Sequence, residues 1–402
     1  MNILLLTNLY PYEKDTNPDI TKVCAFFARE WVKQGHRVIV IVNSSAFPKP
    51  YYTIGNCAKK VVKKHYNLSE IPKTIWRENF EFDDFGVKVI NLPMMKYVPK
   101  GHFTDNTFKK QIKKIINKLD DMCFKPDVIT GHWANPQIKL VADLADHYKV
   151  KSALVLHADY TKELCERYKV NSYVGRIDNF GFRSKSAADK AKEYIDFEKE
   201  PFVCYSGIPE QFVSLSASAD DKNFNAEKLT MITASRLLDW KNIDSVIEAA
   251  DKALYNVDFC YDIVGEGPMD EALKLQAKKS RIADKIVFSG KIGREEVQGK
   301  MAQNQIYVMI SRETFGLVYL EAMLQGCIVI ASRYGGIDGI VIDGETGFLC
   351  EEGNAEELAL IFKRIANLSA EEKKRISANA IETAKKFTDA KVAKMYLESI
   401  VG

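Results

Sequence analysis

The sequence predicts an α/β fold with two doubly wound parallel sheets, and three observations support this. Short apolar runs alternate with longer amphipathic segments along the chain, which is the pattern of strands joined by crossover helices. The chain has 402 residues, too many for one hydrophobic core and suited to two domains of about 200 residues. A polar stretch at 214–225, SLSASADDKNFN, separates the two halves, and the alternation restarts after it.

The N-terminal half, residues 1–213, is predicted to be one Rossmann-like domain. Its apolar runs predict strands at 2–7, 37–42, 87–92, 128–130 and 153–156. Segments with helical spacing of apolar residues follow at 23–34, 108–119 and 138–147.

The C-terminal half is predicted to be a second Rossmann-like domain over 226–385, with 214–225 as the linker. Its predicted strands lie at 229–234, 259–264, 286–289, 306–310 and 328–331, with helices at 242–252 and 317–324. A long helical run is expected over 370–401. Its last part, the helix over 386–402, is a candidate for crossing back to the N-terminal domain.

Composition restricts the class of protein. Apolar residues make up 46% and charged residues 28%, which is typical of a globular protein. No apolar run approaches the roughly 18 to 20 residues of a membrane span, and the start lacks the basic segment of a signal peptide. Eight scattered cysteines without a CxxC pair indicate free thiols in a reducing compartment. We therefore expect a cytoplasmic protein.

The strongest candidate for chemistry is SRETFGLVYLE at 311–321, directly after an apolar strand. Its Gly-containing turn opens a predicted helix, whose N-terminal N–H groups suit a phosphate. Glu313 could meet a neutral polar group near that phosphate, and Glu321 could accept hydrogen bonds from a diol such as ribose. Glu321 could instead be an exposed carboxylate on the helix. Its sequence neighbours are apolar, however, and an unpaired glutamate among apolar residues costs free energy, which argues against that interpretation.

Two further loops follow predicted strands. SRLLDWK at 235–241 presents Arg236 and Lys241, two cations that could neutralise a diphosphate or could be solvated surface charges. IVGEGP at 263–268 contains Gly265, and by itself such a loop indicates only a tight turn.

The N-terminal half has two candidate strand ends. His157 follows an apolar strand, with Asp159 two positions later, and could bind or polarise a substrate. His132 and Trp133 follow another strand in the same way. We regard His132, Trp133 and Asp159 as candidates for the acceptor side, although a lone histidine is more often structural.

The sequence predicts no metal site and no cofactor. It contains no HExxH, no DxD triplet and no Cys/His cluster. It also lacks a Walker loop, a GxGxxG after the first strand and a GxSxG elbow, which argues against a P-loop ATPase, a Rossmann dehydrogenase and a hydrolase.

The ordered set of C-terminal motifs resembles the retaining glycosyltransferases of GT-B fold, family 4. The segments that carry this resemblance are SRLLDWKNID, IVGEGP, VFSGKI, SRETFGLVYLEAMLQGCIVIAS and GGIDGIVIDGETGFL. Glu313 and Glu321 match the paired-glutamate motif of that family. The N-terminal half matches more loosely: Ala158 stands where the family has Gly, Gly339 where many members have Glu, and the first loop, 10–21, lacks a Gly-Gly pair.

The resemblance implies two domains facing across a cleft and a metal-independent, retaining transfer of a hexose-type sugar from a nucleotide diphosphate sugar. A UDP-sugar is the favoured donor. By resemblance, Arg236 and Lys241 hold the diphosphate, Glu321 the ribose and Glu313 the sugar hydroxyls. His157 contacts the donor sugar near its reacting centre. The other implied donor contacts are Gly265, Gly290, Lys291, Thr314, Phe315, Gly316, Leu317 and Val318.

The expected acceptor is a glycan or a lipid-linked sugar in surface polysaccharide or capsule biosynthesis. The formal charge is +3, and residues 1–220 carry +7, which leaves −4 for the rest. Two lysine clusters, Lys59, Lys60, Lys63 and Lys64 and then Lys109, Lys110, Lys113 and Lys114, suggest peripheral docking on the anionic inner face of a membrane. An ordinary surface helix explains the second cluster as well. Nucleic acid is not an expected partner, because no aromatic motif interleaves with these charges.

Three other functions share this architecture: a sugar-nucleotide epimerase, a phosphorylase and a non-catalytic GT-B partner subunit. The first two do not normally carry this motif set, and a phosphorylase needs a pyridoxal lysine loop that the sequence lacks. The unusual first loop is the only support for the third.

Overall fold

The structure is a computed structural model that describes residues 1–15, 21–53, 55, 60–62, 64–65, 74–98, 101–157, 161–313 and 315–402. It divides into two compact units. The first comprises 1–182, 188–204 and 393–402, and the second comprises 183–187 and 205–392. The predicted linker at 214–225 lies within the second unit.

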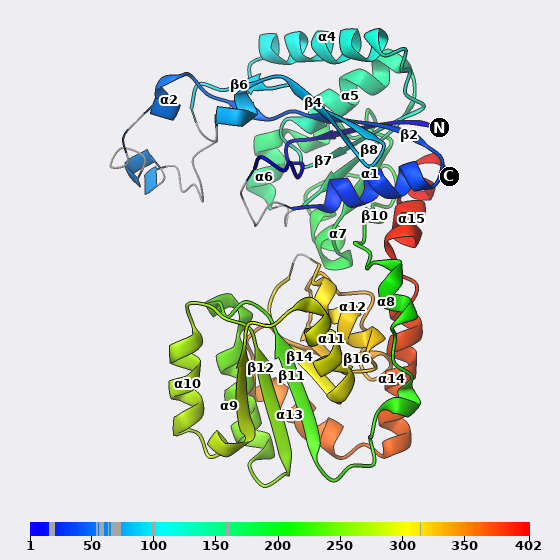
Figure 1. Cartoon of the computed structure of the whole chain (residues 1–402). Helices are drawn as coiled ribbons and strands as arrows, with labels where there is room; N and C mark the ends of the chain where they lie inside the picture. The colour runs from blue at the N-terminus through cyan, green and yellow to red at the C-terminus, as the bar shows by residue number, and fades with distance from the viewer. Residues whose placement is uncertain are drawn as a thin grey trace. The chain divides into compact units, whose positions relative to one another are not determined.

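The first unit contains an eight-stranded sheet in the order β10-β9-β8-β7-β1-β2-β5-β4 (Figure 1). Its strands are β1 (Asn2–Thr7), β2 (Arg37–Val42), β4 (Phe80–Asp84), β5 (Val87–Asn91), β7 (Val128–His132), β8 (Lys151–Leu156), β9 (Asn179–Phe182) and β10 (Phe202–Val203). A separate pair joins β3 (Ser45–Ala46) to β6 (Met94–Met95).

The edge strand β4 departs from the predicted parallel pattern. It runs antiparallel to β5. The two strands are joined by a tight turn in which Phe85 and Gly86 both have positive φ, 55° and 85°. A short turn can join antiparallel strands, whereas parallel strands need a long crossover connection. The apolar pattern of β5 alone does not reveal which of the two connections precedes it.

The helices of the first unit connect these strands. They are α1 (Val23–Lys33), α2 (Pro50–Thr53), α4 (Asp105–Asp121), α5 (Gln137–Tyr148), α6 (Lys162–Tyr168) and α7 (Lys185–Ala191), with short 3₁₀ turns η1 (Thr74–Arg77) and η2 (Val170–Ser172). Helix α7 begins at the boundary between the units.

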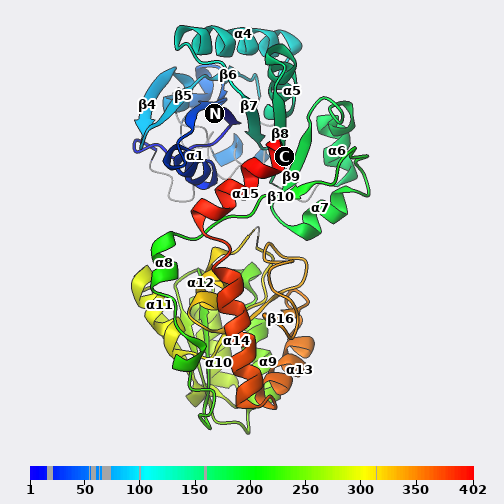
Figure 2. The ribbon, with the colours of Figure 1, turned by 90° about the vertical axis from the view of Figure 1, so that its right-hand side faces the viewer.

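The predicted continuous helix over 370–401 is wrong. The structure has two helices, α14 (Ala370–Ala384) and α15 (Asp389–Val401). Between them the backbone pairs with Ile208, which donates to Phe387 O and accepts from Asp389 N. Most of α15, from Ala393 onward, belongs to the first unit (Figure 2). There Trp31 Nε1 donates to Ala393 O at 2.9 Å, and Asn179 Nδ2 donates to Ile400 O at 3.3 Å.

The second unit contains a six-stranded parallel sheet in the order β13-β12-β11-β14-β15-β16. Its strands are β11 (Leu229–Ala234), β12 (Phe259–Val264), β13 (Ile286–Gly290), β14 (Ile306–Met309), β15 (Ile328–Ser332) and β16 (Gly347–Cys350). Its other helices are α8 (Glu210–Ser214), α9 (Ile243–Leu254), α10 (Asp270–Lys279), α11 (Arg294–Gln303), α12 (Leu317–Leu324) and α13 (Ala355–Ala366), with 3₁₀ turns η3 (Ala219–Asp221), η4 (Asp239–Lys241) and η5 (Ala283–Lys285).

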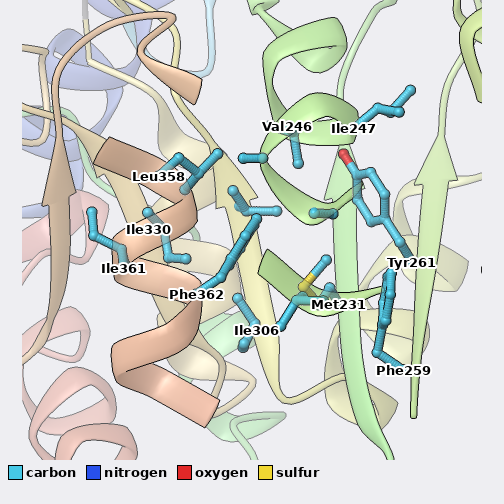
Figure 3. Close-up of a cluster of buried hydrophobic side chains, with 14 of the residues drawn as sticks. Met231, Val246, Ile247, Phe259, Tyr261, Ile306, Ile330, Leu358, Ile361 and Phe362 are labelled. Carbon is cyan, nitrogen blue, oxygen red and sulfur yellow. The ribbon is translucent and has the colours of Figure 1, made fainter. Parts of the chain in front are cut away.

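Alternate residues of these strands pack into two separate cores. On one face Met231, Ile306 and Ile330 meet side chains of α9 and α13 (Figure 3). On the other face Ile232 and Tyr307 meet Leu320 and the rest of a second cluster. Because both faces are covered, the strands are continuous apolar runs rather than alternating ones. The predicted α/β class with two doubly wound sheets is confirmed.

The parallel strands of each sheet end at one edge, where ligands bind in open α/β sheets. Among the described candidates, His132 and Gly290 are the last residues of β7 and β13, Arg236 and Glu313 lie in loops that follow strands, and Glu321 lies within α12. Among the described residues, no helix has both the length and the apolar character that crossing a bilayer requires.

Candidate functional site

The first site element is an ion pair between the two predicted loops of the second unit. Lys241 Nζ donates to a carboxylate oxygen of Glu313, 72 positions further along the chain. Ser311 Oγ donates to the same oxygen at 2.8 Å. Lys241 is only 9% exposed and lies 4.1 Å from the centre of the Trp240 ring. The structure therefore brings together a cation and a carboxylate that the sequence places on separate strand ends.

The backbone of both loops is held in place. Asn242, with φ 53°, ends η4, and its Nδ2 donates to Ile310 O at 2.9 Å. Gly336 N donates to Glu313 O at 2.8 Å. The loop after β11 is thus tied to the end of β14, and the loop after β14 is tied to the one after β15.

The glycine-rich loop after β12 packs directly on the Arg236–Lys241 loop. A Cβ on Gly265 would lie 1.8 Å from Ser235 O, and one on Gly267 would lie 2.2 Å from Leu237 O. Leu237 N donates to Glu266 O at 3.0 Å, and Gly265 N donates to Gly290 O at 2.8 Å. Both positions require glycine because the backbones of the two loops approach closely there. A tight turn by itself would not require glycine for that reason.

Glu321 occupies a buried position on α12. The helix begins at Gly316, whose φ of 78° favours glycine. Glu321 is 6% exposed, and Arg294 and Gln298 of α11 donate to its two oxygens at 2.5 and 2.9 Å. Sequence reasoning missed Arg294 and Gln298. Their i,i+4 spacing on one helix was the available signal.

Packing around α12 is reinforced by buried aromatic side chains. Burial, together with the charge of Glu313, raises the pKa of Tyr319 well above its ordinary range. Its hydroxyl therefore stays protonated and donates to Met309 O at 2.8 Å. Phe315 is buried, and the guanidinium of Arg183, another residue not anticipated, lies 5.8 Å from the centre of its ring.

The other predicted donor contacts are more open. Arg236 is exposed and forms no ion pair with any described residue. Lys291 is exposed, while Gly290, Leu317 and Val318 are half-buried. Thr314 and Asp159 lie outside the described residues, as do Lys59 and Lys63.

The first unit has its own group at the carboxyl ends of β7 and β8. His132 Nδ1 lies 2.7 Å from His157 Nε2, and the rings of Trp133 and His157 stack with centres 4.1 Å apart. His132 is completely buried, so it bonds to His157 instead of presenting its ring to solvent. On its other side, His132 Nε2 lies 3.2 Å from the hydroxyl of Tyr396 on α15.

In the part of the chain that the structure describes, no group of His, Cys, Asp or Glu side chains has an arrangement that could hold a metal ion.

The six-stranded parallel sheet, covered by helices on both faces and followed by loops with charged side chains, defines the second unit as an α/β domain. Residues 216–383 match the family described as Glycosyl transferases group 1. The matched residues lie within the second unit.

Two curated relatives are similar in sequence. The chain is 28% identical over 248 residues to N-acetyl-alpha-D-glucosaminyl L-malate synthase of Bacillus anthracis, covering 58% of the chain and 63% of that protein. It is 26% identical over 371 residues to an uncharacterized glycosyltransferase of Methanocaldococcus jannaschii, covering 89% and 99%.

Among solved structures, HepE of Anabaena in complex with UDP has a TM-score of 0.64 at 18% identity, with 99% of each chain covered. The same protein has also been solved with UDP-glucose. This likeness establishes the GT-B fold.

Proposed function

We propose that the chain transfers a hexose-type sugar from a nucleotide diphosphate sugar to a hydroxyl acceptor, with retention at the anomeric carbon. The observation that carries the proposal is the ion pair between Lys241, which is buried, and Glu313, which is half-buried; the loop that holds Lys241 also carries the exposed Arg236. The family match over residues 216–383 and the UDP complexes of HepE support a nucleotide donor, and a UDP-sugar is our first candidate.

In the proposed reaction, the bond between the anomeric carbon and the diphosphate oxygen breaks. A bond to the acceptor oxygen forms, and the acceptor proton passes to the departing diphosphate. Arg236 and Lys241 stabilise the charge that develops on that diphosphate. Donor binding gives Lys241 a second anionic partner besides Glu313, and it leaves Glu313 able to accept from sugar hydroxyls.

Glu321 is proposed to bind the ribose diol. Its two oxygens already accept from Arg294 and Gln298. A carboxylate oxygen can accept more than one hydrogen bond, so these contacts orient the group without using its full capacity.

The test is a panel of nucleotide sugars screened by thermal stabilisation, since a ligand that binds the folded state raises the melting temperature. The stabilising donor is then incubated with and without acceptors. We expect free nucleotide diphosphate only when an acceptor is present. An isomerised nucleotide sugar without acceptor would indicate an epimerase, and binding without any turnover would indicate a non-catalytic partner.

The acceptor side is proposed to include an anionic membrane surface. Helix α4 buries Ile115 and Leu119 and exposes Lys109, Lys110, Lys113 and Lys114. Its apolar face is therefore occupied within the unit, and docking would be electrostatic. Lys118 is not part of this face, because it pairs with Glu81.

Co-sedimentation with anionic liposomes at physiological salt tests this membrane proposal. We expect binding that is lost when the four exposed lysines are changed to glutamine and kept when Lys278 and Lys279, on α10, are changed instead. Equal sedimentation of all three proteins, or none, would refute it.

A further inference from the structure

A chain of hydrogen bonds runs from α15 to the half-buried His157 within the first unit. The Tyr396 hydroxyl lies 2.5 Å from Thr130 Oγ1 and 3.2 Å from His132 Nε2, and His132 Nδ1 lies 2.7 Å from His157 Nε2. Thr130 and His132 are completely buried, and Tyr396 is 2% exposed. We call these four residues the relay.

The relay couples the hydrogen positions of the two imidazoles. The two facing nitrogens of His132 and His157 are close enough to share only one hydrogen. If Tyr396 donates to His132 Nε2, then His132 donates from Nδ1 and His157 carries its hydrogen on Nδ1. If the direction is reversed, His157 carries it on Nε2. In both cases, the nitrogen of His157 that holds hydrogen is coupled to the direction of the hydrogen bond between Tyr396 and His132.

The ring of Tyr396 is also fixed by its surroundings. It packs edge-on against Phe27 at 5.1 Å between ring centres and lies 5.4 Å from Trp31. A ring packed against these aromatic side chains has little conformational freedom, so its hydroxyl group stays in one position. The remaining link, between His157 and Trp133, is a stacking contact that fixes the plane of the imidazole.

We propose that Tyr396 is a positioning residue that acts through His132 to set the tautomer and orientation of His157. The inference rests on the proposed function only for the catalytic consequence, because His157 is one of the residues assigned to sugar transfer. The relay itself is a property of the first unit. Through the relay, helix α15 would orient His157 in addition to packing against the first unit.

The competing explanation is that Tyr396 only anchors α15. Asn179 offers a matched control, because its side chain also donates to α15, at Ile400 O, and touches no member of the relay by a hydrogen bond that the structure records. Tyr396→Phe removes the two hydrogen bonds of the Tyr396 hydroxyl and Asn179→Ala removes one hydrogen bond to α15, but only the first interrupts the relay.

The first measurement is a long-range ¹H–¹⁵N spectrum of protein labelled at histidine, which distinguishes imidazole tautomers. The chain has six histidines, so the signals of His132 and His157 can be assigned by single substitutions. We expect Tyr396→Phe to shift both signals, and Asn179→Ala to shift neither. Unchanged signals in Tyr396→Phe would overturn the relay. Thr130→Val, which interrupts the far end, is the second variant should Tyr396→Phe fold poorly.

The second measurement is a kinetic double-mutant cycle. We expect Tyr396→Phe to lower kcat about tenfold with the donor KM little changed, which corresponds to the loss of one hydrogen bond. In a His157→Ala background the same substitution should have no further effect. Additive effects would overturn the proposal. Absence of sugar transfer by the unchanged protein would instead overturn the proposed function, and the spectra would still decide the relay.

Discussion

The two units place different chemistry at the same point of the same kind of fold. In the second unit, the loops after β11 and β14 carry the charged pair Lys241–Glu313, and the helices α11 and α12 carry a second pair, Arg294–Glu321. In the first unit, the ends of β7 and β8 carry imidazole and hydroxyl groups joined by hydrogen bonds. Each unit thus presents side chains where its parallel strands stop.

This difference separates binding of a charge from orientation of a neutral group. Under the proposed function, a diphosphate needs a cation whose position is fixed before it arrives, and pairing with Glu313 fixes Lys241. A sugar hydroxyl needs a donor or an acceptor at one nitrogen, and a hydrogen-bond chain can select it. In both units the site lies at the carboxyl ends of parallel strands, and the residues that follow those strands determine its chemistry.

The largest effect is expected from breaking the buried pair of the second unit. Lys241→Met should lower sugar transfer about 100- to 1000-fold, because a fixed positive charge beside the diphosphate is lost. It should also destabilise the fold by about 3 to 5 kcal/mol, because Glu313 is left unpaired. Steady-state kinetics and denaturant unfolding measure the two effects.

The control is the double variant Lys241→Met with Glu313→Gln. It removes both charges and should recover much of the lost stability but none of the activity. Recovery of turnover in the double variant would contradict the assignment of this pair to the donor site.

The next effect concerns the close approach of two loops in the second unit. Gly265→Ala should destabilise by about 2 to 3 kcal/mol, because φ is 136° and the new methyl group would lie 1.8 Å from Ser235 O. Gly299 is a glycine of α11 with nothing within 4 Å of its added Cβ. Gly299→Ala should stabilise by about 0.5 to 1 kcal/mol. Thermal unfolding that gave both variants the same sign would refute the close-packing explanation.

A smaller effect is expected from the second charged pair. Arg294→Ala should weaken donor binding about tenfold, because Glu321 loses the group that orients it; the side chain of Arg294 is 52% exposed, which limits the effect. Arg281 is a matched control, with a side chain 56% exposed and an ion pair to Asp251 in the same unit. Titration calorimetry should show donor affinity within twofold of normal in Arg281→Ala. Equal weakening in both variants would remove Glu321 from the donor site.

The smallest expected effect is a difference in salt dependence between the donor site of the second unit and the relay of the first unit. Raising ionic strength from about 0.05 to 0.5 M should weaken donor binding only a few-fold, because screening acts mainly on the exposed Arg236. The kcat ratio between unchanged protein and Tyr396→Phe should stay constant, because the hydrogen bonds of Tyr396 are buried and the relay consists of imidazole and hydroxyl groups. A ratio that changed with salt would show that the relay responds to surface charge.

Much of the fold could be predicted from the sequence. The strands at 2–7, 37–42, 229–234 and 259–264 have the predicted bounds, because buried parallel strands are continuous apolar runs whose ends coincide with polar loops. The antiparallel β4 and the break between α14 and α15 were not predicted, because each depends on a backbone partner distant in sequence or on a turn geometry.

The α/β class, the two sheets and the residue types that follow the strands can be predicted from the amino-acid sequence, since periodicity and loop composition are local properties. Which of those residues meet depends on the folded arrangement of the chain. Lys241 pairs with Glu313, Arg294 with Glu321, and Tyr396 with His132, across 72, 27 and 264 positions. Strand order and helix packing determine these long-range partners, and neither can be read from a local sequence pattern.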